Sequence, residues 1–331
     1  MKNQGAVLPL HYRKKKSGCL FVVLIAIVLV LAFKFGLSVM NNITKKSVSS
    51  VHSVASGSPL TLIPQRSDTP VSIDTGNLHS PCAILVRMSD KAVLMQKQSD
   101  KRIYPASLTK MMTVVAAIEN IPDLQKKIEL SSSIFQPFYK ADASMAGFQP
   151  GEKVRAIDLL YGAMLPSGAE CCVGLADEIS GSEQNFVKKM NQKAEQLGMN
   201  NTHFANSTGL QNENHYTTVK DLSLLLVYAL QNKTFREIFT SSRHSTTATN
   251  KHPDGITFTS TLSQNLKNQT LPGGEILGGK TGYTDEAGLC LASLAQIDGR
   301  EYILVTAGAK GDHKTEQYNI DDACEVYKNL N

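Results

Sequence analysis

Residues 106–113 read Ala-Ser-Leu-Thr-Lys-Met-Met-Thr, and the rest of the chain is best interpreted around this stretch. Pro105 precedes it, and an apolar, helix-favouring run continues to Ile118. The pattern predicts a strand or turn that breaks into a helix, with Ser107 in the first turn and Lys110 on the same face. A lysine that is partly removed from water can be neutral and accept the proton of a serine hydroxyl. The stretch is therefore suited to nucleophilic catalysis.

A Ser-x-x-Lys sequence is weak on its own, because a helix N-cap serine followed by a solvated lysine has the same pattern. Two further motifs favour the catalytic interpretation. Residues 167–169 are Ser-Gly-Ala, and residues 280–282 are the only Lys-Thr-Gly in the chain. Serine D,D-peptidases and class A β-lactamases carry their three motifs in this order.

The composition is that of a globular protein. The chain has 331 residues, of which 42% are hydrophobic and 19% are charged, enough for one large domain or two modest ones. The net charge of +5 comes from residues 1–17, which hold five basic residues and no acidic one. The remainder carries 29 basic and 29 acidic residues, so it gives no support for nucleic-acid binding.

The cysteines and histidines do not form a recognisable metal motif. Six cysteines are present without a Cys-x-x-Cys spacing, and the histidines are scattered without a His-Glu-x-x-His. We therefore expect no metal and no cofactor, and we reject a zinc carboxypeptidase. The cysteines are expected to be small buried apolar side chains. A disulfide between Cys82 and Cys324 is left open.

The N-terminal region predicts export of the rest of the chain. Residues 1–17 are basic, and residues 18–40 are apolar with a single lysine, long enough to cross a bilayer. Basic residues favour the cytoplasmic side, so we expect a single-pass membrane anchor with a cytoplasmic N-terminus. Residues 41–78 predict a flexible extracellular stalk, and residues 79–331 the catalytic domain. A cleaved signal peptide is the alternative and would export the rest as well.

Strands are expected near both ends of the folded part and helices between them. The strands are predicted at 83–88, 92–96, 276–283, 289–295 and 302–309, and the helices at 154–165, 170–179, 182–197, 219–230 and 315–330, besides the one that follows Ser107. This order predicts an α/β sandwich with an inserted helical subregion. Ser167 lies at a break between two of its helices.

From about residue 80 to 331 the chain resembles the serine-type D-Ala-D-Ala carboxypeptidases, the low-molecular-mass penicillin-binding proteins of peptidase family S11. The resemblance rests on Tyr-Pro-Ala-Ser-Leu-Thr-Lys at 104–110, on His-Phe-Ala-Asn-Ser-Thr-Gly-Leu at 203–210 with His-Tyr-Thr-Thr at 215–218, and on Gly-Lys-Thr-Gly-Tyr-Thr at 279–284. It implies a β-lactamase/transpeptidase-like antiparallel sheet flanked by helices. It also implies a bacterial cell-membrane enzyme that acts outside the cytoplasm on the wall.

The resemblance implies roles for three catalytic residues. Ser107 would attack the carbonyl between the last two D-alanines of a peptidoglycan stem pentapeptide and form an acyl-enzyme. Lys110 would be the base, and Ser167 would relay a proton to the leaving amine. Water would then release the shortened peptide. β-Lactams would be covalent inhibitors that trap Ser107 as a slow ester.

The resemblance also implies how the substrate is bound. Lys280 would bind the terminal carboxylate of a peptide ending in D-Ala-D-Ala, helped by the hydroxyl of Thr281. The backbone N–H groups of Ser107 and Tyr283 would form the oxyanion hole.

One departure from the family pattern leaves alternatives open. The second motif is usually Ser-x-Asn, and here Ala169 replaces the asparagine. A catalytically weak penicillin-binding or wall-sensing ectodomain is therefore an alternative. A β-lactamase is another, and it would need a carboxylate that holds the deacylating water. Glu152 and Glu170 flank the second motif, but ordinary charges at helix ends explain them more simply.

Overall fold

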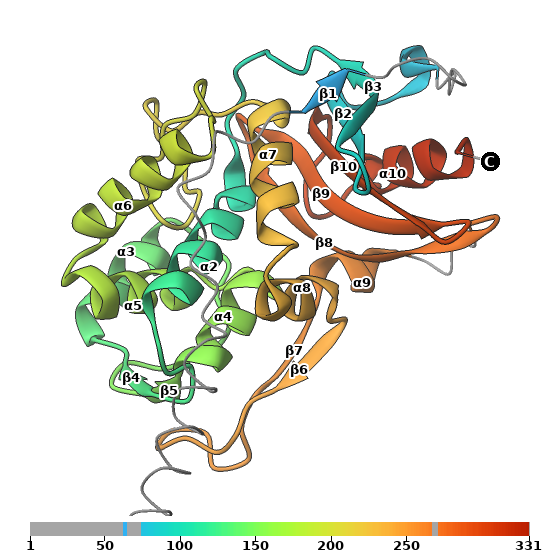
Figure 1. Cartoon of the computed structure of the whole chain (residues 1–331). Coiled ribbons are helices and arrows are strands. Elements are labelled where there is room, and N and C mark those ends of the chain that lie inside the picture. The colour runs from blue at the N-terminus through green and yellow to red at the C-terminus, as the bar shows by residue number, and fades with distance from the viewer. Residues whose placement is uncertain (1–61, 65–73, 267–270, 331) are drawn as a thin grey trace, which may run out of the picture. The chain divides into compact units, whose positions relative to one another are not determined.

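The sheet at the centre of the fold consists of strands that are largely apolar on both faces. The structure is a computed structural model that describes residues 62–64, 74–266 and 271–330. The strands pair in the order β1-β3-β2-β10-β9-β8 (Figure 1). They are β1 (Ile63–Pro64), β2 (Cys82–Arg87), β3 (Ala92–Lys97), β8 (Gly274–Thr284), β9 (Gly288–Ile297) and β10 (Arg300–Ala309). All neighbours are antiparallel except β1 and β3, which confirms the predicted antiparallel sheet.

Helices cover both faces of the sheet, as the apolar strands require. Along β2, Ile84 and Val86 belong to the larger apolar cluster, whereas Leu85 belongs to a second cluster on the opposite face. Helix α7 (Val219–Ala229) packs on the first face, and α10 (Tyr318–Lys328) packs on the second (Figure 1).

The predicted helical subregion is present and is assembled around the helix that follows Ser107. Helix α2 (Thr109–Asn120) packs against α4 (Ala156–Met164), α5 (Ala169–Ser180) and α6 (Glu183–Gln196). The remaining described elements are short: α3 (Phe135–Lys140), α8 (Lys233–Thr240), α9 (Thr261–Asn265), the 3₁₀ turns η1 (Thr75–Asn77), η2 (Ala106–Leu108) and η3 (Ser132–Ile134), and the strands β4 (Lys127–Glu129), β5 (Lys153–Arg155), β6 (Arg243–Ser245) and β7 (Thr257–Thr259).

Local capping chemistry explains where several helices begin. The side chain of Ser182 accepts a hydrogen bond from the N–H of Asn185 at the start of α6, and Thr218 accepts one from Asp221 at the start of α7. The last helix begins at Tyr318 and not at residue 315, because residues 312–315 form a turn. The Asp312 carboxylate accepts the backbone N–H groups of that turn.

Cys82 and Cys324 do not form the disulfide that the sequence leaves open, and the expectation of buried, unpaired cysteines is confirmed for the five described ones. Both cysteines are free and buried. Cys82 belongs to the apolar cluster on the α7 face of the sheet, whereas Cys324 belongs to the cluster on the α10 face, so the sheet separates them. Burial raises the pKa of Cys324 to about 11, which keeps the thiol protonated.

The predictions for residues 1–17 and 18–40 lie outside the described residues. Of the predicted stalk, 41–78, the structure describes residues 62–64 and 74–78. Two of these residues, Ile63–Pro64, pair with β3. The domain boundaries stay predictions. Within the part of the chain that the structure describes, no helix combines the length and the apolar character needed to cross a membrane.

Candidate active site

Ser107 lies in a strained turn that leads directly into helix α2. It is the middle residue of η2 (Ala106–Leu108), and the preceding Ala106 has a φ of 46°. A non-glycine residue seldom adopts this left-handed region, and such residues gather at functional sites. The turn places the Ser107 side chain at the head of α2, as its sequence predicts.

Lys110 meets Ser107 one helical turn later. Its Nζ lies 2.8 Å from Oγ of Ser107 and donates to the backbone carbonyl of Thr208 at 2.6 Å. The residue is only 3% exposed. Burial lowers the pKa of Lys110, because a charged amine loses its hydration there. A buried amine beside a serine hydroxyl is the arrangement that activates a serine nucleophile.

The segment at 203–210 positions the carbonyl that Lys110 contacts. The hydroxyl of Thr113, on α2, donates to the carbonyl of Ser207 at 2.6 Å. The backbone N–H and the hydroxyl of Ser207 both donate to Glu183, at 2.8 and 2.6 Å. In sequence, this segment resembles a feature of the family, but its pattern predicts no role for it. A backbone acceptor has no side-chain signature, so only the folded contact reveals Thr208.

Gly209 is needed where this segment touches the Ser107 turn. Its φ is +85°, and a Cβ built there would lie 1.9 Å from the carbonyl oxygen of Ala106. Asn206 fixes the turn, because its Oδ1 accepts the N–H of Gly209 at 2.7 Å. Only a glycine therefore allows this close approach.

Ser167 occupies a second strained position, between α4 and α5. Its φ is 70°, in the left-handed region. Its Oγ accepts a hydrogen bond from Nζ of Lys280 at 3.0 Å, and the same Nζ donates to the carbonyl of Thr281 at 2.8 Å. Lys280 is fully buried. Burial, and then the like charge of Lys110, lower the pKa of Lys280 well below its usual value.

The two serines line one cleft, together with residues from β8. The cleft has a volume of about 320 Å³ and is lined by Ser107, Ser167, Thr281, Gly282 and Tyr283, among others. Neither lysine lines the cleft, but Nζ of Lys110 contacts Oγ of Ser107, and Nζ of Lys280 donates a hydrogen bond to Oγ of Ser167. The structure thus brings all six predicted site residues together.

The β8 strand lies directly against the Ser107 turn. A Cβ built at Gly282 would lie 3.1 Å from the backbone nitrogen of Ser107, so the strand and the turn approach closely there. The hydroxyl of Thr281 lies 2.6 Å from that of Thr261, which also lines the cleft. The hydroxyl of Tyr283 donates to Asp285 at 2.6 Å. Two threonine hydroxyls side by side are suited to binding a carboxylate.

The region around Ala169 is held by backbone and carboxylate contacts. The N–H of Ala169 donates to the carbonyl of Ser144, which also lines the cleft. Next to it, Oε1 of Glu170 accepts the N–H groups of Ala146 and Gly147, at 2.7 and 3.0 Å. Glu170 therefore ties the 144–147 loop to the start of α5, beside Ser167.

Neither glutamate that flanks the second motif lines the cleft. Glu170 and Glu152 are both fully buried. Glu152 accepts hydrogen bonds from the hydroxyl of Thr249 and the N–H of Gln149, and contacts His252. Both carboxylates have structural partners, which does not favour the β-lactamase alternative. Among the described residues, no group of three or more His, Cys, Asp or Glu could hold a metal ion.

The chain is similar in sequence to known D-alanyl-D-alanine carboxypeptidases. Residues 68–311 match the profile of the Peptidase_S11 family, described as D-alanyl-D-alanine carboxypeptidase. The chain is 35% identical over 231 residues to D-alanyl-D-alanine carboxypeptidase DacF of Bacillus subtilis, a match that covers 69% of this chain and 57% of that protein. It is 33% identical over 218 residues to a D-alanyl-D-alanine carboxypeptidase of Streptomyces sp. K15, covering 63% of this chain and 74% of that protein.

The fold is similar to solved structures of the same kind. The crystal structure of the Streptomyces K15 DD-transpeptidase aligns with a TM-score of 0.69 at 26% identity, covering 76% of this chain and 97% of that chain. A carboxypeptidase structure from Mycobacterium tuberculosis aligns with a TM-score of 0.67 at 24% identity, covering 81% of this chain and 95% of that chain, and supports the fold alone.

Proposed function

The chain belongs to the D-alanyl-D-alanine carboxypeptidase family of serine peptidases, and from this premise we propose that it removes the terminal D-alanine from peptidoglycan stem pentapeptides. The observation that carries the proposal is the 2.8 Å contact between the buried amine of Lys110 and Oγ of Ser107, at the edge of a cleft that Ser167 and Thr281 also line. The peptide bond between the last two D-alanines would be cleaved by acyl transfer to Ser107.

The first step transfers the acyl group to Ser107. The Lys110 amine takes the hydroxyl proton while Oγ attacks the carbonyl carbon between the last two D-alanines. The negative charge that develops on the carbonyl oxygen is stabilised by the backbone N–H groups of Ser107 and Tyr283. The close approach of β8 to the Ser107 turn at Gly282 supports this pair of donors.

The second step releases D-alanine and then the shortened peptide. Ser167 passes the proton from Lys110 to the departing amine, and its hydrogen bond to Lys280 orients the hydroxyl for this transfer. The C–N bond breaks and an ester remains on Ser107. Water then attacks the ester, so that the peptide leaves with a free carboxylate and Ser107 regains its proton.

The terminal carboxylate of the substrate is held at the other end of the cleft. The neighbouring hydroxyls of Thr281 and Thr261 donate to it, and Lys280 contributes positive charge from its buried position behind Ser167. From the sequence we expect a direct contact between this carboxylate and Lys280. Because the Lys280 side chain is completely buried, we propose that it acts indirectly, through the hydrogen bonds that it donates to Ser167 and Thr281.

Penicillin labelling and D-alanine release test the proposal together. The chain is incubated with penicillin, and mass spectrometry locates the adduct on Ser107. D-Alanine release from a synthetic pentapeptide is measured in parallel. Ser107→Ala abolishes both signals, whereas Ser133→Ala, an exposed serine outside the cleft, changes neither.

Each alternative gives its own result in these assays. Acylation without D-alanine release favours a penicillin-binding or wall-sensing ectodomain. This alternative is prompted by Ala169, which stands where the family motif usually has asparagine. Rapid release of hydrolysed penicillin favours a β-lactamase. Failure of the wild-type chain to acylate at all refutes the proposal.

The proposal includes a place of action. A single-pass anchor at 18–40, with residues 1–17 in the cytoplasm, would hold the catalytic domain outside the cell membrane, beside the wall. The charge pattern of the sequence supports this arrangement. Membrane fractionation of the full chain and of a chain lacking residues 1–40 tests it, since only the former should sediment with membranes.

A further inference from the structure

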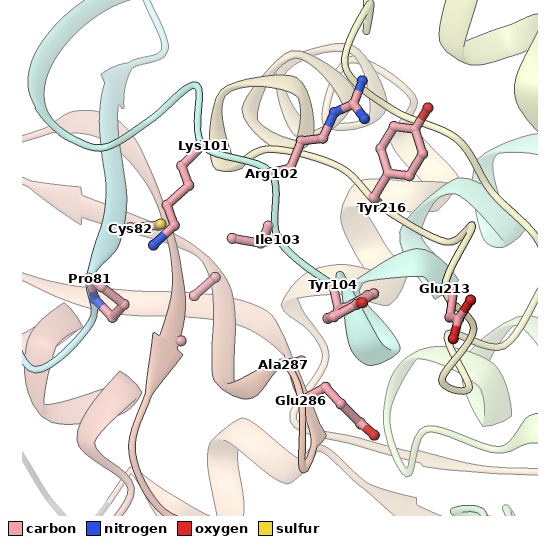
Figure 2. Close-up of a pocket in the computed structure, with 12 residues that line it drawn as sticks. Pro81, Cys82, Lys101, Arg102, Ile103, Tyr104, Glu213, Tyr216, Glu286 and Ala287 are labelled. Atoms are coloured by element: carbon pink, nitrogen blue, oxygen red, sulfur yellow. The ribbon is translucent and has the colours of Figure 1, made fainter.

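A second cavity lies at the end of the sheet and shares no lining residue with the candidate active site. Its volume is about 430 Å³. Its walls come from the start of β2, the segment before η2, the loop at 213–216, the turn between β8 and β9, and the end of β10 (Figure 2). Five separate segments thus enclose a space that the mechanism above does not use.

Charged side chains of both signs line this cavity without neutralising one another. They are Lys101, Arg102, Glu213 and Glu286, and none forms an ion pair with another described residue. The Arg102 guanidinium lies 4.2 Å from the ring centroid of Tyr216, where a cation–π contact occupies it. Lys101 and the two glutamates remain available to a ligand.

The available charges are separated along the cavity. In Figure 2 the Lys101 side chain reaches toward Cys82 at one end, whereas Glu213 and Glu286 lie toward the other end, near Tyr104. A ligand that matches this pattern carries an ammonium group at the glutamate end and a carboxylate at the lysine end.

The glutamate end is continuous in sequence with the catalytic segments. Tyr104 precedes Ser107 by three residues, and Glu286 follows Tyr283 by three. β8 is the edge strand of the sheet. A peptide lying along this edge, with its terminal carboxylate at Thr281, continues past Tyr283 toward the turn between β8 and β9 that holds Glu286. An extended peptide advances about 3.3 Å per residue, so two or three residues span roughly 7–10 Å.

We propose that this cavity binds the part of the substrate peptide that lies upstream of the scissile bond. An ammonium group on a side chain close to the scissile bond is held by Glu213 and Glu286, and a carboxylate further upstream is held by Lys101. The inference rests on the proposed function and adds the charge pattern of the peptide that the site selects.

Paired synthetic peptides isolate the ammonium contact. Both end in D-Ala-D-Ala and carry a lysine immediately before these residues, and they differ only in acetylation of its Nε. With the full wild-type chain at low salt, we expect kcat/KM to be about fivefold higher for the free amine, mainly through KM, as for exposed charge pairs. The double variant Glu213→Gln/Glu286→Gln should reduce this ratio to about one. The matched control Glu195→Gln, an exposed glutamate on α6, should keep the wild-type ratio.

The contact between the ammonium group and the two glutamates can also be measured without catalysis. The same two peptides are titrated against the full chain carrying Ser107→Ala, where binding is measured by calorimetry, so a failure of the proposed function leaves this comparison intact. Equal affinity and equal kcat/KM for the two peptides in the presence of both glutamates would overturn the proposal. A ratio that persists in the double glutamate variant would overturn it as well.

Discussion

Replacing Gly209 by alanine should damage the active site although residue 209 is not expected to contact the substrate. The new Cβ would lie 1.9 Å from the carbonyl oxygen of Ala106, and real Cβ contacts are essentially never shorter than 3.0 Å. The segment or the Ser107 turn must therefore move by about 1.1 Å. Either movement alters the 2.8 Å contact between Lys110 and Ser107 or the carbonyl of Thr208 that holds the lysine.

The expected effects follow from this displacement. A misplacement of about 1 Å in a catalytic group costs up to ~10²-fold in rate, so we expect penicillin acylation to slow by about that factor. The left-handed backbone costs an alanine about 1–2 kcal/mol, and the steric overlap adds about 1–3 kcal/mol. Urea unfolding should therefore show a loss of about 3 kcal/mol in the free energy of unfolding.

A second glycine separates the clash from the backbone strain. Gly299, in the turn between β9 and β10, has a φ of +74°, and nothing lies within 4 Å of a Cβ built there. Gly299→Ala should lose only about 1–2 kcal/mol and acylate at the wild-type rate. Acylation of Gly209→Ala at the wild-type rate, with an unfolding free energy equal to that of Gly299→Ala, would refute the reasoning.

Three further predictions concern buried charges. Because burial lowers the pKa of Lys110, the acylation rate should rise with pH through that lowered value. The variant Lys110→Arg should acylate about 10³-fold more slowly. Acylation is measured with fluorescent penicillin, and a rate that does not change with pH would contradict this prediction. Glu170→Ala leaves two backbone N–H groups without an acceptor and should cost about 3 kcal/mol in urea unfolding, whereas Glu170→Gln keeps an acceptor and should cost less. Burial raises the pKa of Asp158, but hydrogen bonds from His244 and Arg155 outweigh it and leave the pKa lowered. The stability that the charged Asp158 contributes is therefore complete above the pKa of the unfolded state, and it is lost as the pH falls through the pKa of the folded state. Asp158→Asn should lower the free energy of unfolding by about 3 kcal/mol at neutral pH. In acid the difference should vanish, so a variant that stays less stable than wild type there would argue against this prediction.

The catalytic pair could be predicted from the sequence because its chemistry is local. Ser107 and Lys110 are three residues apart, and the helix that brings them onto one face is evident from the apolar run that follows. The strands β8, β9 and β10 are similarly evident, because apolar runs and the turn at Asp298 mark them. Lys280 and Ser167 required the resemblance to a family, since 113 residues separate the two side chains that meet.

The features that sequence analysis missed depend on contacts between distant segments. The carbonyl of Thr208 that holds Lys110 has no side-chain signature and lies 98 residues away in the chain. The possible bridge from Cys82 to Cys324 could not be excluded without knowing that the two thiols face opposite sides of the sheet. The second cavity is likewise absent from any linear pattern, because five segments enclose it.

The two buried amines, Lys110 and Lys280, have a consequence for how ligands and protons compete. Burial lowers the pKa of both amines, and the charge of Lys110 lowers that of Lys280 further, so the two lysines bind protons less tightly than they would in water. A bound carboxylate favours the protonated form of a nearby amine, so we expect its binding to be accompanied by proton uptake from the buffer. Affinity for acidic ligands then weakens in alkaline solution, while the basic form of Lys110 that attack requires becomes more abundant. The enzyme's best working pH is thus a compromise between holding its substrate and reacting with it.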